Sequence, residues 1–235
     1  MQNTDVMNSR ANGKPGRRGP GGKLTREAIV SVARTLIDDE GPDALSMRRL
    51  AGVVNSSPMA LYHHVDGRAD LLAAIFAQIC DEAPRPDLPD DPLEKMVKLT
   101  ELGQRLLHDH PWTLEILSTD LALCRETLWY VEEFLSAACA AGCTEKQAVS
   151  IYLTTWNLII GNAVMRKNRE AVRTSSEDGL PAPLDVSDSA DLPRCQTLVS
   201  DWPALADSHD LRGGLAPMLA ALVSEATAPV AARAG

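Results

Sequence analysis

The sequence lacks the motifs that most enzymes carry. It contains no phosphate-binding loop, no HExxH zinc motif and no GxSxG nucleophile elbow. It also has no Glu-x-x-His pair, which a di-iron helical bundle needs. The N-terminus has no apolar signal core, and no uninterrupted apolar run approaches the roughly 18 residues of a membrane span. These absences predict a cytoplasmic protein that is not an enzyme and does not enter a membrane.

Metal ligands are equally sparse. Five cysteines are scattered along 235 residues, and an odd number is typical of reduced thiols rather than a disulfide framework. Cys139 and Cys143 are one helical turn apart and could share a metal, yet no third ligand lies nearby, which favours core positions. In His108-Asp109-His110 adjacent side chains diverge on a helix, and the proline that follows favours a helix end. We therefore predict no metal and no cofactor.

Strand-like alternation of Val, Ile and Thr is absent too, whereas apolar residues recur with the 3.6-residue period of helices. The expected fold class is therefore all-α, and 45% hydrophobic residues are ample for its core. The net charge of −9 disfavours indiscriminate binding to nucleic acid. Residues 1–68, however, hold ten Lys/Arg against seven Asp/Glu, whereas the remaining residues hold thirteen against twenty-five. A basic end joined to an acidic body suits a protein that brings one end to DNA.

Residues 46–65, SMRRLAGVVNSSPMALYHHV, are predicted to form two short helices joined by a tight turn. Ser46 can cap the first helix, and Asn55 tolerates the left-handed conformation in which a helix stops. Ser57 can cap the second helix, where Pro58 stands at the first position without losing a hydrogen bond. This is the helix-turn-helix pattern, whose second helix enters the major groove of DNA. An ordinary helical hairpin with a solvated face is the alternative, because caps occur at any helix.

The second helix of this motif offers an exposed face that suits DNA. Leu61 and Val65 are spaced to hold the helix to its own core. A tyrosine and two histidines can donate to phosphates, and small apolar groups can contact a thymine methyl. The exposed face so predicted comprises Met59, Ala60, Tyr62, His63 and His64.

From Leu24 to Ile79 the chain resembles the DNA-binding domain of the TetR family of bacterial repressors. The matching segments are LTREAIVSVARTLIDDEGPDALSMRRLA and SSPMALYHHVDGRADLLAAI. The most specific part is LYHHV, followed three positions later by a basic residue and then by a Leu-Leu pair. The resemblance implies an all-α homodimer that binds a palindromic double-stranded DNA operator. It also implies that a small-molecule effector, held in the C-terminal domain, releases the DNA.

Carried over residue by residue, the resemblance implies phosphate contacts for Ser46, Ser57, Tyr62 and Arg68, and base-facing positions for Met59, Ala60 and His63. Arg48 is implied to contact a base or a phosphate. Three departures from the family pattern are visible. Asn55 stands where the turn often has glycine, Arg68 where lysine is usual, and Ala60 lacks a hydroxyl that some members present. Base recognition at Ala60 is therefore expected to rely on apolar contact.

Composition divides the chain into three parts. Residues 1–23 are rich in Gly, Pro and Asn and are predicted to form a disordered basic arm. Its Arg17 and Arg18 either reach DNA or belong to a solvated tail. The DNA-binding domain is predicted at 24–82. The proline-rich stretch that follows separates it from a ligand-binding and dimerisation domain predicted at 92–228.

The C-terminal part has the composition of a small-molecule binding domain. Seven of the nine aromatic residues follow residue 110, which predicts the apolar walls of a ligand pocket. Candidate pocket residues are Trp112, Phe134, Tyr152, Trp156 and Asn157. The last three belong to a predicted helix at 145–170. Its line of Ser150, Thr154, Asn157 and Gly161 serves either a pocket or a close helix–helix contact, and the contact is slightly favoured.

Helices are also expected at about 120–141 and 209–226. The resemblance implies that helices 145–170 and 209–226 pack against their mates in a homodimer. The sequence supports this independently, because helix 145–170 is apolar on more than one side and so needs more cover than its own domain supplies.

The sequence and its resemblance therefore predict a DNA-binding transcriptional regulator, and within that class a ligand-responsive repressor. One alternative is an all-α helical-bundle enzyme, which the missing catalytic motifs disfavour. The other is a helical interaction module that uses the motif only for packing. Salt-sensitive binding to a specific DNA sequence would separate the regulator from both.

Overall fold

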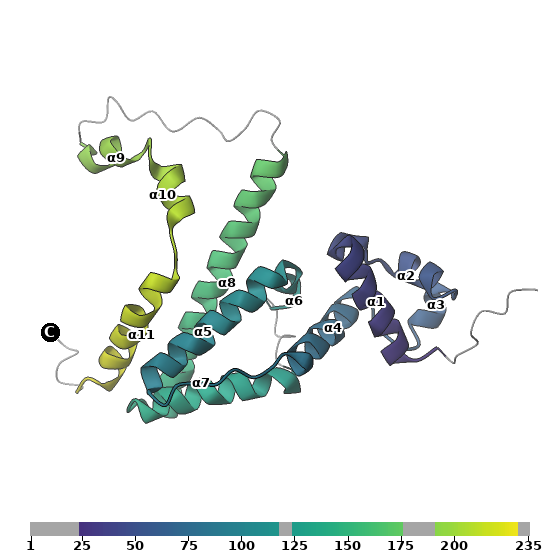
Figure 1. Cartoon of the computed structure of the whole chain (residues 1–235), viewed down its shortest axis with the longest axis horizontal. Coiled ribbons are helices and arrows are strands. Elements are labelled where there is room, and N and C mark those ends of the chain that lie inside the picture. The colour runs from purple at the N-terminus through teal and green to yellow at the C-terminus, as the bar shows by residue number, and fades with distance from the viewer. Residues whose placement is uncertain (1–23, 118–123, 176–190, 230–235) are drawn as a thin grey trace, which may run out of the picture.

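The computed structural model describes residues 24–117, 124–175 and 191–229. Within these ranges every regular element is a helix, which confirms the predicted all-α class (Figure 1). The basic arm predicted at 1–23, with Arg17 and Arg18, lies outside the described residues.

Four helices form a small bundle at one end of the molecule (Figure 1). They are α1 (Arg26–Glu40), α2 (Met47–Val53), α3 (Pro58–Leu61) and α4 (Arg68–Glu82), with a 3-10 turn η1 (Pro42–Ala44) after α1. Helix α1 begins where the Thr25 hydroxyl accepts a hydrogen bond from the Ala28 N–H at 3.2 Å. It ends at Gly41, whose φ of 84° lies in the left-handed region that a glycine reaches without strain. The bundle closes on apolar side chains that are at most 1% exposed, among them Ile29, Leu50, Leu61, Leu71 and Ile75.

A larger helical body follows the extended, proline-rich segment 83–91. Its elements are α5 (Pro92–Asp109), η2 (Pro111–Thr113), α6 (Leu114–Leu117), η4 (Arg125–Thr127), α7 (Leu128–Ala140), α8 (Glu145–Ser175), α9 (Pro193–Leu198), α10 (Trp202–Ser208) and α11 (Arg212–Thr227). Helix α5 is central, because it packs against α7, α8 and α11. The core between these four helices is built on Met96, Leu99, Phe134, Ala138 and Leu219, all buried. Cys143 is buried in this core and Cys139 packs against it.

The core of the N-terminal bundle does not stop at the end of α4. One continuous apolar cluster runs from α1 and α4 through Leu107, Trp112 and Ile116 to Ile159 and Ala163 of α8. The helix-turn-helix bundle is therefore packed onto η4 and α6, and through α6 onto α8, rather than joined to the body only by the segment 83–91.

Two helix boundaries differ from the sequence-based expectation, and one helix is additional to it. Helix α7 was expected from about residue 120 but begins at Leu128, because Cys124 has extended backbone angles that interrupt a continuous helix. Helix α8 runs to Ser175, past the expected residue 170. Helix α10 was not expected, although Pro203 stands at a position of its first turn where a missing N–H costs little.

Candidate nucleic-acid interface and effector cavity

The helix-turn-helix motif has the capped geometry that the sequence predicts. The Ser46 hydroxyl accepts a hydrogen bond from the Arg49 N–H, and the Ser57 hydroxyl accepts one from the Ala60 N–H, each at 3.2 Å. Asn55 has a φ of 52°, the left-handed conformation that ends α2. The two caps and this turn fix the direction of α3 relative to α2.

Helix α3 is short, and a tight turn extends it. The Tyr62 N–H bonds to the Pro58 carbonyl at 3.2 Å, and the Val65 N–H bonds to the Leu61 carbonyl at 3.0 Å. Leu61 and Val65 are buried, at 0% and 2% exposure, and anchor this recognition helix to the bundle. The α-helix was expected to continue through residue 65, but the chain leaves regular α-helix geometry after Leu61.

The side chains predicted to contact DNA lie mainly on the outer surface. Met59 is 69% exposed and Tyr62 is 50% exposed, so both side chains are accessible to a partner. Ser46, Arg48, Ser57 and His63 are exposed, while Ala60 and His64 are half-buried. Arg48 makes no hydrogen bond or ion pair within the described residues, whereas the neighbouring Arg49 pairs with Glu40.

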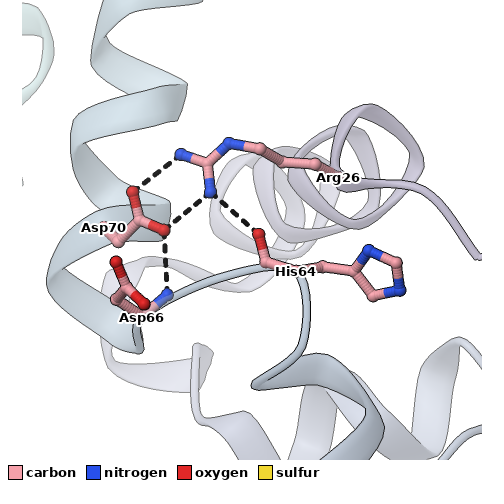
Figure 2. A network of polar contacts seen from close by, with 4 residues as sticks. All are labelled: Arg26, His64, Asp66 and Asp70. Carbon is pink, nitrogen blue, oxygen red and sulfur yellow. Dashed lines mark hydrogen bonds and ion pairs between the residues drawn. The ribbon is translucent and has the colours of Figure 1, made fainter.

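A polar network holds the end of the recognition helix in place (Figure 2). The Arg26 guanidinium donates two hydrogen bonds of 2.7 Å to the carboxylate of Asp70 and one of 3.1 Å to the carbonyl of His64. Asp70 also accepts the Asp66 N–H at 3.0 Å. The hydrogen bonds from Arg26 lower the pKa of Asp70 below its ordinary value. These hydrogen bonds connect the first turns of α1 and α4 to His64, near the end of the motif.

Arg68 has a different place from the one that the resemblance implies. Its guanidinium donates to the carbonyl of Leu45 at 3.3 Å and to that of Pro42 at 3.2 Å. It also forms an ion pair with Glu115 of α6. A guanidinium that already holds three protein groups is poorly placed to hold a phosphate as well, so Arg68 joins the bundle to the body instead.

A cavity of about 690 Å³ lies between α4, α5, η4, α7 and α8. Three of the five predicted pocket residues line it: Tyr152, Trp156 and Asn157. The other two predicted residues do not line this cavity. Phe134 is buried in the core of the body, 1% exposed, and Trp112 is buried in the cluster that joins the bundle to the body and lines a separate cleft.

Aromatic rings form one side of this cavity. Tyr152 and Trp156 stack with ring centroids 6.3 Å apart and planes 10° from parallel. Tyr130 meets both rings edge-on, with centroids 6.4 Å away, and Trp129 meets Tyr130 at 6.2 Å. Burial raises the pKa of the Tyr130 phenol, so this group stays protonated and can donate a hydrogen bond.

Gly103 of α5 makes room for the Tyr130 ring. A Cβ atom at this position would lie 3.0 Å from the Tyr130 hydroxyl oxygen and 3.0 Å from Cδ1 of Ile159. The glycine therefore allows the Tyr130 hydroxyl to approach the α5 backbone.

Sequence reasoning missed several residues of the cavity wall. Trp129 and Tyr130 were visible as aromatic residues, but periodicity alone does not tell which face of α7 meets the core. Phe76, Ile79 and Cys80 of α4 also line the cavity. The sequence does not identify them as cavity residues, because nothing local to α4 indicates that the body covers its last turns.

Comparison with known proteins follows the same division. Residues 29–75 match the family described as bacterial regulatory proteins, tetR family. Residues 85–222 match the tetracyclin repressor-like C-terminal domain. The first match covers most of the helix-turn-helix bundle, and the second covers most of the cavity wall and of the helical body.

Two curated relatives are helix-turn-helix regulators. The HTH-type transcriptional repressor DrrR1 of Streptomyces coeruleorubidus is 30% identical over 151 residues, which cover 62% of this chain and 55% of DrrR1. An HTH-type transcriptional regulator of Saccharopolyspora erythraea is 30% identical over 197 residues, 81% of this chain and 77% of the relative. The chain thus spans about half the length of DrrR1 and about three quarters of the second relative.

Among solved structures, the TetR family protein ActR of Streptomyces coelicolor, in complex with (S)-DNPA, has the same fold. The TM-score is 0.65 at 21% identity, covering 91% of this chain and 100% of ActR. The family matches, the two relatives and the shared fold agree. The chain belongs to the TetR family of bacterial transcriptional regulators, a family of DNA-binding proteins rather than enzymes.

Proposed function

We propose that this regulator binds a palindromic DNA operator as a homodimer, through the exposed face of α3, and that a small molecule in the cavity controls that binding. The proposal is supported by the two sets of contacts that α4 makes, one at each end. Asp70 in its first turn holds the end of the recognition helix through Arg26. Phe76, Ile79 and Cys80, farther along α4, form part of the cavity wall. A molecule in the cavity therefore touches the helix that positions the DNA-reading surface.

The proposed DNA contacts divide by what each side chain can recognise. Base contacts are assigned to Met59, Ala60 and His63, and phosphate contacts to Ser46, Ser57, Tyr62 and His64, with Arg48 in either role. Arg68 is left out of this set because its guanidinium holds Glu115 and two backbone carbonyls. Arg17 and Arg18 are proposed to add phosphate contacts from the N-terminal arm, since basic arms of other helix-turn-helix proteins reach DNA. A transcription regulator with these contacts acts in the bacterial cytoplasm.

The proposed dimer uses the outer face of α8 together with α11. Four large apolar side chains of α8 that do not line the cavity are between 37% and 60% exposed in the single chain: Val149, Val164, Met165 and Val172. Nothing lies within 4 Å of a Cβ built on Gly161, so a second helix can approach the backbone there. By length and composition alone α8 could cross a membrane, a test that core helices of soluble proteins also pass. In a DNA-binding regulator, the partner protomer is the natural cover for this face.

The dimer is the means by which a ligand can release DNA. A two-fold dimer must hold its recognition helices about 34–36 Å apart to reach successive major grooves. A ligand that favours another separation lowers operator affinity without touching DNA. The cavity volume of about 690 Å³ suits a drug-sized molecule, and ActR, with the same fold, was crystallised with (S)-DNPA bound.

A band shift with the DNA upstream of the protein's own gene tests the proposal, repeated at rising salt. We expect binding to one palindromic site with affinity that falls steeply with salt, because Lys and Arg side chains displace counterions from phosphates. Binding that is equal for all DNA sequences, or no binding at low salt, would contradict it.

The interface is tested by a charge placed on α8. Met165→Glu should give monomers that no longer bind the operator, although the residues of the motif are unchanged. Leu128→Glu is the matched control, because Leu128 is 51% exposed and lies on α7. Leu222 of α11 is a poorer site for this test, since it already packs against the core of its own protomer. Light scattering at micromolar concentration decides, and a Met165→Glu variant that stays dimeric would remove α8 from the interface.

A further inference from the structure

The chemistry of the cavity wall indicates which class of molecule it binds. This inference rests on the proposed function, because it assumes that the cavity is the effector site. The walls combine a small number of polar groups, several of which constrain the ligand, with five aromatic rings: those of Phe76, Trp129, Tyr130, Tyr152 and Trp156.

The stacked pair of Tyr152 and Trp156 selects for a flat partner. The two rings are 10° from parallel, so a planar aromatic molecule that stacks on one of them lies parallel to both and makes more contact than a globular one. Tyr130 lies edge-on to both rings.

Tyr130 lines the cavity, and its hydroxyl makes no hydrogen bond within the described residues. Every side-chain oxygen or nitrogen of these residues that is fully shielded from water has a hydrogen-bond partner, so the Tyr130 hydroxyl is not fully shielded. It supplies one hydrogen-bonding group to a ligand that lies flat on the neighbouring rings.

The charges around the cavity favour a cation. Glu126 of η4 lines the cavity, is only partly exposed, and has no ion-pair or hydrogen-bond partner within the described residues. Burial, with smaller contributions from Cys124 and Glu126, raises the pKa of the Cys80 thiol to about 12, which agrees with a carboxylate near Cys80 at the cavity wall. A carboxylate at an apolar wall without a cationic partner is a group that a basic nitrogen can satisfy.

The other ionisable groups of the wall do not reverse this preference. Asp109 adds a second carboxylate at the exposed end of α5. Arg105 is exposed and borders both this cavity and the separate cleft near Trp112, so its charge is shared with solvent. His110 lies edge-on to Trp112 with ring centroids 6.2 Å apart. The lining residues thus include two carboxylates and the one guanidinium of Arg105, and the Arg85 guanidinium lies beside the cavity at Trp129. The preference for a cation therefore depends on Glu126, the partly exposed carboxylate without a partner in the described part of the chain.

One cation–π contact is already present beside the cavity. The guanidinium carbon of Arg85, in the segment that joins the bundle to the body, lies 5.1 Å from the ring centroid of Trp129. The aromatic rings of this region therefore accept a positive charge at their faces.

We propose that the effector is a flat aromatic molecule with a basic nitrogen, stacked on Tyr152 and Trp156 with its positive charge against Glu126. An aromatic carboxylate would bring its charge towards two carboxylates, and an aliphatic cation would lose the stacking surface.

Three acridines of nearly equal size test the proposal on the full-length, DNA-free protein. At pH 8, 9-aminoacridine is a cation, acridine is neutral and acridine-9-carboxylate is an anion. Binding is followed by quenching of tryptophan fluorescence and by calorimetry. We expect the cation to bind most tightly and the anion most weakly, with about tenfold or more between cation and neutral ring, the effect of one charge-assisted contact.

Variants locate the site. Glu126→Gln should remove the preference for the cation and leave the affinity for neutral acridine within about twofold, because only the charge is lost. Asp109→Asn, the matched control at the exposed carboxylate, should change the preference far less. Trp156→Leu should weaken binding of all three compounds. Circular dichroism of each variant verifies that the fold is kept.

The outcomes separate this inference from the proposed function. Equal binding of cation and neutral ring, or a Glu126→Gln variant that keeps the preference, overturns the cationic class while leaving the cavity as a site for aromatics. Failure of all three compounds to bind, or a Trp156→Leu variant that binds like the wild type, overturns the inference as a whole. Operator binding is measured without any of these compounds, so its success or failure is an independent result.

Discussion

The ion pair between Arg26 and Asp70 should contribute a measurable part of the free energy of unfolding. Hydrogen bonds that involve a charged group contribute roughly 1.5–3 kcal/mol when they are shielded from water. The two side chains are 43% and 25% exposed, so water competes for them. We therefore expect a coupling energy of about 1–2 kcal/mol for this bidentate pair, well above the ~0.2–1 kcal/mol of an ordinary surface pair.

A double-mutant cycle measures this energy. Arg26→Ala, Asp70→Ala and the double variant are unfolded in urea at one fixed protein concentration, because a dimer's stability depends on concentration. The cycle cancels the hydrogen bonds that each single change also removes from His64 and Asp66, provided the rest of the structure is unchanged.

The pair Arg34 and Glu82 is the matched control. It joins the same two helices, α1 and α4, at 2.7 Å, but Glu82 is 60% exposed. Its coupling energy should be about 0.2–0.5 kcal/mol. If the two cycles gave equal coupling energies, the network at the end of the recognition helix would be no stronger than a surface ion pair, and our account of how α3 is held would fail.

The same pair predicts a dependence on pH with a definite sign. Hydrogen bonds from Arg26 hold the folded-state pKa of Asp70 below its ordinary value of 3.8. A depressed folded pKa means that the contribution to stability is fully present well above pH 3.8 and is lost as the pH falls through the lower, folded value. The difference in unfolding free energy between wild type and Asp70→Asn should therefore narrow on acidification below about pH 4. A constant difference down to pH 3 would contradict the assignment.

The remaining predictions concern DNA contact, the joint between bundle and body, and the cavity. Tyr62→Phe should weaken binding about equally for all DNA sequences, whereas Arg48→Ala should relax preference at one base pair per half-site, by ~1–3 kcal/mol if the arginine reads guanine. A uniform loss for Arg48→Ala, measured by band shifts on a set of single-base operator variants, would place it on a phosphate. Arg68→Ala should lower the urea midpoint because it breaks the link to Glu115, and a variant that loses DNA affinity with unchanged stability would restore its phosphate role. Gly103→Ala should weaken binding of flat aromatic molecules by displacing the Tyr130 hydroxyl, which calorimetry measures. Its free energy of unfolding, measured in urea, should stay within ~1–2 kcal/mol of wild type because better helix propensity offsets the closer packing.

The local part of the fold could be predicted from the sequence because its signals are local. A serine at each cap, a proline at the first position of α3 and an asparagine with positive φ act on their immediate neighbours, so the motif appeared where it was expected. The length of α3 was overestimated. Its helical pattern continues to Val65, but the last turn is tightened to bring both Leu61 and Val65 into the core.

The cavity could be predicted in kind but not residue by residue. Phe134 and Tyr130 are one helical turn apart on α7, and periodicity gives both to the apolar face. In the structure Phe134 packs in the core with Met96 and Leu99, whereas Tyr130 lines the cavity. That choice depends on how α7 is rotated against α5, which is a tertiary property. Arg68 shows the same limit, because its partner Glu115 is 47 residues away in the sequence.

The rigidity of α4 bears directly on how an effector in the cavity could act on DNA binding. Between Arg68 and Glu82 this helix contains neither proline nor glycine, so no residue within it favours a kink. Leu71, Leu72 and Ile75 are buried against α1 and the rest of the bundle, which leaves little free volume to absorb a displacement. In the proposed mechanism, a ligand that shifts the last turns of α4 at the cavity therefore moves its first turn as well, where Asp70 holds the recognition helix through Arg26. A hundredfold loss of operator affinity requires a coupling free energy of about 2.7 kcal/mol. One charge-assisted contact at Glu126 and one stacked ring together supply a coupling free energy of that order only if the ligand makes both contacts in the released state and neither in the DNA-bound state.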